Sequence, residues 1–165
     1  LKNEGRTTLF VHAVQTGEVA QEEIEPHAER APLSIQYQTL DGAPLDVATL
    51  AQGTNFSAYL TIQNPTGQPL THLALTQLIP FGWEVLNTRF LPGAFTASSV
   101  VSYQDIRDDR VLSYIDVLPA GGRVTIRVDL CATYAGRFYL PPTVCEGMYD
   151  STLQSNTAGR WIEVK

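Results

Sequence analysis

The stretch NFSAYLTIQ at residues 55–63 decides the fold class, because apolar and more polar side chains alternate along its whole length. Phe56, Ala58, Leu60 and Ile62 fall on one face of an extended chain. A period of two is typical of a β-strand that has one buried and one solvated face. The segment therefore predicts a strand of an antiparallel sheet.

Similar segments recur on both sides of this stretch and predict further strands. The segment at 73–77 must end by Pro80, which has no N–H to give to a ladder. No apolar period of 3.6 residues extends over 11 residues or more, and residues 46–52 would make one helical turn at most. Many short strands separated by turns predict an all-β fold, an antiparallel β-sandwich. The other predicted strands are 34–39, 100–103, 111–117, 124–130, 137–140 and 160–164, and residues 85–90 are expected to be extended.

Composition narrows the function classes. Hydrophobic residues make up 44% of the 165, enough for the core of one domain. A net charge of −6 with only 11 Lys and Arg argues against a nucleic-acid partner. No apolar run reaches the roughly 20 residues of a membrane helix, so we expect no direct membrane insertion. Because the chain starts at Leu1 without a leader, we expect a piece of a longer protein.

The first 32 residues differ from the rest. Residues 7–15 read TTLFVHAVQ and predict a strand, either the last one of a preceding domain or an extra one of this domain. Residues 18–32 carry several glutamates and two prolines and predict an acidic linker. The sandwich domain is expected to occupy residues 33–165.

The sequence predicts a domain that is not an enzyme and binds no metal or cofactor. His12, His27 and His72 are scattered and lack a second ligand at metal spacing. No nucleophile elbow, metalloprotease motif, phosphate loop or dinucleotide fingerprint is present.

A charged cluster lies at residues 105–110. Arg107 and Arg110 are interleaved with the carboxylates, so the local charge nearly cancels, which is unfavourable for a hard cation. The pattern favours a hairpin tip held by Asp–Arg hydrogen bonds. A carbohydrate-processing enzyme is a weaker alternative, because no partner acid or base is visible. The carboxylates are Asp105, Asp108 and Asp109.

Cys131 and Cys145 match no zinc or redox spacing. They could be small core thiols, or a disulfide that ties a hairpin to its following loop. If the strand with Cys131 turns at 135–136, its partner on the return strand lies near Leu140. Cys145 would then lie past the Cα separation of about 7 Å that a disulfide spans.

Met148 and Tyr149 stand between loop-forming residues, Gly147 before them and Asp150 after them. The pair could cap one end of the sandwich. It could instead be an exposed apolar finger that packs onto a partner, because Met adapts to irregular apolar surfaces and Tyr adds a large contact area with a hydroxyl group.

Three sequence segments, taken in their order along the chain, resemble the last domain of a bacterial α2-macroglobulin. They are LIPFGWEVLNTRF at 78–90, YQDIRDDRVLSYIDVL at 103–118 and AGRFYLPPTVCEGMYD at 135–150. The resemblance runs from about Leu33 to Val164. It implies a macroglobulin-like, immunoglobulin-like sandwich within a large envelope protein, periplasmic or attached to the outer membrane, that traps proteases.

The resemblance also implies a role for the Met-Tyr pair. In this family the last domain packs on a helical domain that carries a Cys–Gln thioester, and Met148 and Tyr149 would shield that bond until a protease cleaves the bait region. The thioester motif is absent from this chain. Where the parent also lacks it, the pair is a plain interdomain contact. The alternative function is a stand-alone protein-binding or adhesion module of the bacterial cell envelope.

Overall fold

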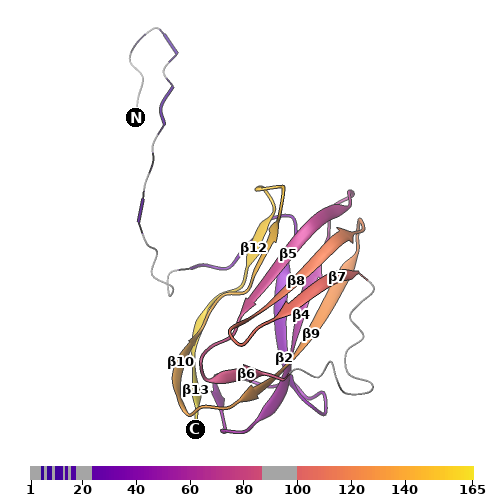
Figure 1. Cartoon of the computed structure of the whole chain (residues 1–165). Helices are drawn as coiled ribbons and strands as arrows, with labels where there is room; N and C mark the ends of the chain where they lie inside the picture. The colour runs from indigo at the N-terminus through magenta and orange to yellow at the C-terminus, as the bar shows by residue number, and fades with distance from the viewer. Residues whose placement is uncertain are drawn as a thin grey trace.

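Two β-sheets face each other across one hydrophobic core, and a short third sheet extends them at one end (Figure 1). The computed structural model describes residues 24–86 and 100–165, together with residues 5, 7, 8, 10–12, 14, 16 and 17. Within these residues every regular element is a strand, and all but one of the strand pairs are antiparallel. The predicted antiparallel sandwich is therefore confirmed.

The four-stranded sheet is built on β4, which has the bounds that its alternation predicts. Phe56, Ala58, Leu60 and Ile62 are all buried. The opposite face of the strand is more exposed, except at Ser57, which is buried and donates a hydrogen bond to Asp129. In order across the sheet, the strands are β2 (Leu33–Thr39), β4 (Asn55–Gln63), β9 (Arg123–Ala132) and β6 (Trp83–Val85).

The six-stranded sheet supplies the other side of the core. Its strand β5 turns Leu73 and Leu75 inward, and β8 turns Val111 and Ile115 inward, against the buried face of β4 and β9. In order, the strands are β1 (His27–Ala28), β12 (Gln154–Asn156), β11 (Val144–Gly147), β5 (Leu70–Leu78), β8 (Arg110–Leu118) and β7 (Val101–Ile106).

The third sheet joins β10 (Gly136–Leu140), β13 (Arg160–Val164) and β3 (Thr49–Leu50), and β13 runs parallel to β3. The pairs Leu140↔Arg160 and Val144↔Asn156 have the same register, although they belong to different sheets. β10–β11 and β12–β13 are thus the two arms of one long hairpin, which changes sheets at Pro141–Pro142. Figure 1 shows its arms rising along one side of the molecule to a tip beyond β12.

One expectation for the strand pairing needs correction. Residues 137–140 do not return along the strand that carries Cys131, because β9 pairs with β4 and β6 while β10 pairs with β13. Residues 46–52 form no helical turn, because Thr49 and Leu50 are pulled into β3 beside β13. In the segment 85–90, which is expected to be extended, Val85 belongs to β6, and residues 87–90 lie outside the described residues.

The amino-terminal boundary also differs from the expected one. His27 and Ala28, inside the predicted acidic linker, form strand β1 and pair with Asn156 and Ser155. Ala31 is fully buried in the core. The ordered sandwich therefore begins before Leu33. In the predicted strand at 7–15, residues 9, 13 and 15 lie outside the described residues, and the described residues between 5 and 17 form no strand.

An aromatic cluster in the core gives a stability prediction. Phe56 is fully buried and meets the Trp83 ring edge to face, with 4.9 Å between ring centroids. We expect Phe56→Ala to lower the free energy of unfolding by about 3–5 kcal/mol, because it removes buried surface and leaves a cavity. Urea unfolding measures the change. Phe81→Ala is the control, because Phe81 is 91% exposed. Equal losses for the two variants would contradict the assignment of the core.

Candidate functional site

The Met-Tyr loop, residues 148–152, forms the tip of the long hairpin and points away from the core. Met148 is 51% exposed and Tyr149 82% exposed. β11 and β12 lead into and out of the loop, and β11 pairs with β5 on its other side. Neither side chain is buried in the interior of this domain, so the sandwich does not use the pair as core.

Backbone hydrogen bonds give the loop a fixed shape. Gly147 N donates to Leu153 O at 2.9 Å, and Leu153 N donates to Asp150 O at 3.1 Å. Met148 N donates to His72 O of β5 at 2.9 Å. A Cβ on Gly147 would lie 2.8 Å from Asp150 O, so glycine is needed for this close turn. The exposed Met148 and Tyr149 are therefore carried by a loop that backbone hydrogen bonds hold in shape.

Asp150 is the polar centre of the loop. Its Oδ1 accepts hydrogen bonds from Thr152 N at 3.1 Å and from Thr152 Oγ1 at 2.6 Å. Its Oδ2 lies 2.6 Å from Arg30 Nη1, which also donates to Thr152 Oγ1 at 3.1 Å. The hydrogen bonds from Thr152, and then the one from Arg30, hold the pKa of the Asp150 carboxyl below its ordinary value.

His72, to which the sequence assigned no role, supports the Tyr149 ring. The two rings meet edge to face with 5.2 Å between their centroids. His72 has a φ of 54°, a left-handed conformation that is uncommon for a residue other than glycine. No sequence signal marks this contact, because it depends on β5 and β11 being neighbours in the sheet.

The charged cluster at 105–110 forms the tip of the β7–β8 hairpin. Arg107 Nε lies 2.8 Å from Asp105 Oδ2, and Arg110 Nε lies 3.0 Å from Asp109 Oδ2. Asp108 is exposed between them. Among the described residues, no group of three or more His, Cys, Asp or Glu side chains could hold a metal ion.

The two cysteines are free thiols on different sheets, so the disulfide considered from the sequence is not formed. Cys131 lies on β9 between Leu130 and Ala132, which face the core, so its own side chain faces the other way. Cys145 lies on β11 and is fully buried, and burial raises the pKa of its thiol to about 12.

A second pair of exposed aromatic residues lies beyond the other end of β5. Phe81 follows that strand and is 91% exposed, and Tyr134 donates a hydrogen bond to Glu84 Oε1 at 2.8 Å. Gly82 O accepts from Thr133 N and Tyr134 N and so ties the two loops together. Both side chains are exposed and lie outside the core.

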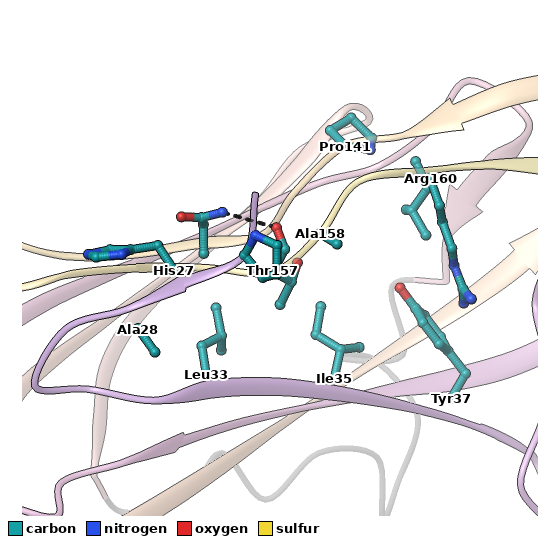
Figure 2. Close-up of a pocket in the computed structure, with 12 residues that line it drawn as sticks. His27, Ala28, Leu33, Ile35, Tyr37, Pro141, Thr157, Ala158 and Arg160 are labelled. Carbon is teal, nitrogen blue, oxygen red and sulfur yellow. Dashed lines mark hydrogen bonds between the residues drawn. The ribbon is translucent and has the colours of Figure 1, made fainter. Parts of the chain in front are cut away.

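A groove of about 470 Å³ opens between β2 and the outer edge of the long hairpin. In Figure 2, Leu33, Ile35 and Tyr37 point into it from β2, and Arg160 reaches toward the Tyr37 ring. Burial raises the pKa of the Tyr37 hydroxyl to about 12, so the group stays neutral. Pro26, His27 and Ala28 line the same groove, so strand β1 borders a cavity where it faces β2.

The described residues contain no helix long and apolar enough to cross a membrane.

Comparison with known proteins places these features in a family. The family model for the bacterial alpha-2-macroglobulin MG10 domain matches residues 33–151. The alpha-2-macroglobulin of Pasteurella multocida is 30% identical over 89 residues, which cover 54% of this chain and 5% of that protein. The alpha-2-macroglobulin homolog of Yersinia pestis is 28% identical over 150 residues, which cover 78% of this chain and 7% of that protein. The chain thus spans a small fraction of these relatives.

Solved structures show the same fold. The native conformation of Escherichia coli alpha-2-macroglobulin matches with a TM-score of 0.77 at 16% identity, over 89% of this chain and 10% of that one. A Salmonella alpha-2-macroglobulin matches with a TM-score of 0.74 at 20% identity, over 86% of this chain and 10% of that one. Because the family model covers most of the sandwich, the chain belongs to the bacterial alpha-2-macroglobulin MG10 domain family.

Proposed function

We propose that this domain is a non-catalytic cover within a protease-trapping protein of the bacterial cell envelope. Its Met-Tyr loop packs on the helical domain that carries the thioester and keeps water and amines from that bond. Cleavage of the bait region by a protease then moves the two domains apart. The observation that carries the proposal is the exposure of Met148 and Tyr149 on a braced loop.

The chemistry of the loop suits this task. A thioester persists only where water and amines are excluded, and apolar or aromatic side chains exclude them. Met148 can adapt its shape to a neighbouring surface, and Tyr149 adds a large and rather rigid contact area. The loop hydrogen bonds hold both residues in place before binding, which lowers the entropic cost of forming the interface.

The solved relatives support the same proposal. The Salmonella protein has been solved after reaction with methylamine, as expected of a protein that carries a reactive acyl group. The Escherichia coli protein has been solved after activation by trypsin and by porcine elastase. A cover that is present in the native form and displaced by proteolysis fits both facts.

Tyr149→Ala in the full-length protein tests the proposal. We expect methylamine to consume the thioester about tenfold faster without protease, because losing one anchor residue of an interface costs about 1–2 kcal/mol. In that reaction the amine nitrogen bonds to the acyl carbon and the cysteine leaves as a thiol, so the free thiol reports the rate. Tyr103→Ala is the matched control, because Tyr103 is also exposed but lies on β7. A rate equal to that of the unaltered protein would contradict shielding.

Acidification should loosen the cover through Asp150. Its pKa is lowered in the folded chain, so its carboxylate stabilises the loop above the ordinary aspartate pKa of about 3.9 and stops doing so as pH falls through the lowered value. We expect a carbon-13 NMR titration of this chain to give Asp150 a midpoint below the ordinary one. Thr152→Val should raise this midpoint. A midpoint at or above the ordinary aspartate value in the unaltered chain would contradict the stabilisation of the loop by the Asp150 carboxylate.

A further inference from the structure

The chain segment that enters the domain covers the outer edge of the long hairpin that carries the Met-Tyr loop. In this entry segment, residues 24–31, strand β1 pairs with β12, and Glu29 N donates to Gln154 O at 3.1 Å. Asn156 Nδ2 donates to Glu25 O at 2.9 Å. β12 has only three residues and lies between β11 and this segment. The support of the loop on this side therefore comes from residues more than 100 positions earlier in the chain.

Arg30 is the contact that reaches the loop itself. Its Nη1 atom donates to Asp150 Oδ2 and to Thr152 Oγ1, at 2.6 and 3.1 Å. The φ of Arg30 is 62°, so its backbone is in the left-handed region, which is unfavourable for a residue with a side chain. Such strained positions persist where surrounding contacts hold them. The contacts to Asp150 and Thr152 can hold Arg30 in this left-handed conformation.

The rest of the entry segment is only lightly attached. His27 and Ala28 are exposed, and the groove of Figure 2 lies between them and β2. The segment holds on mainly through its backbone pairs with β12 and through Arg30, until Ala31 enters the core. Segments with few buried contacts are the first to open locally.

We propose that Arg30 is the positioning residue of the Met-Tyr loop, so that the entry segment holds the loop in place and releases it when the segment is pulled away. Force or displacement that reaches the domain along its incoming chain would then loosen the cover at its tip. The coupling is a property of this chain, while its effect on a thioester rests on the proposed function. Arg30 acts through Asp150 and Thr152, the two loop residues that it contacts.

Amide hydrogen exchange of this chain tests the coupling. Arg30→Gly removes the side-chain contact and also relieves the left-handed backbone, so the fold should stay intact. We expect the amides of Met148, Thr152 and Leu153 to exchange about two- to fivefold faster, the range that an exposed ion pair supports. The amides of β4 and β9 should not change. Unchanged exchange in the loop would overturn the proposal.

Two further variants sharpen the test. Arg107→Ala removes an equally exposed ion pair at the β7–β8 tip, and it should leave the loop amides as they are. Asp150→Asn removes the carboxylate charge that Arg30 contacts. Combining it with Arg30→Gly should add little to the faster exchange, because both changes remove the same ion pair. Full additivity of the two effects would contradict a direct link.

A reversible lock tests the release in the full-length protein. Ala28 and Ser155 are directly opposed on β1 and β12, so Ala28→Cys with Ser155→Cys can form a disulfide across the two strands. We expect the oxidised lock to prevent protease from raising the methylamine rate, and the reductant to restore the increase. An unchanged response in the oxidised form would overturn release through this segment. Failure of Tyr149→Ala to alter the rate would instead count against shielding, whatever the exchange data show.

Discussion

The arrangement depends on one hairpin register that continues unbroken from the third sheet to the Met-Tyr loop. Gly136 pairs with Val164 at one end, and Val144 pairs with Asn156 beyond the two prolines. Because the register is constant, the position of the tip follows from pairs formed far below it. A slip of one residue would turn Cys145 out of the core and reverse every face of the hairpin.

The two prolines explain how one hairpin serves two sheets. Pro141 and Pro142 have no N–H to donate, so the ladder loosens at this point and each arm can bend. Thr143 and Thr157 resume the pairing directly above, where Thr157 N donates to Thr143 O at 3.0 Å. Gly159 faces the break, and a Cβ there would overlap the Tyr139 hydroxyl. Below the break the hairpin packs beside β3, and above it joins β5.

The same geometry separates the residues that stabilise the fold from the exposed tip. Residues that face the core, such as Phe56 and Ile162, are buried and hold the sheets together. Met148 and Tyr149 lie beyond the last paired residues of the hairpin and add little to that core. Substitutions at the tip should therefore leave the fold intact. The support that the tip needs is polar and is centred on Asp150, which Thr152 and Arg30 contact.

The sequence predicts the longer strands well, misses the short strands β1, β3, β11 and β12, and predicts strand partners poorly. Period-two alternation locates β4 and β13 to the residue, because burial of one face imposes it locally. It cannot show that β10 pairs with β13 and not with β9, since pairing depends on contacts between distant segments. The Met-Tyr pair can be recognised in the sequence as two large side chains between loop-forming residues. Its shielding role is predicted only by the family resemblance. Arg30 and His72 carry no such mark, because Arg30 meets Asp150 from 120 positions away and His72 meets Tyr149 only through the sheet.

Site-specific crosslinking from position 149 is the most direct measurement of the central claim. A photoreactive phenylalanine analogue at Tyr149 in the full-length protein would bond to whatever lies against the tip. The account predicts crosslinks to the thioester domain in the native form and their loss after protease cleavage. Crosslinks confined to this domain, or identical before and after cleavage, would contradict it.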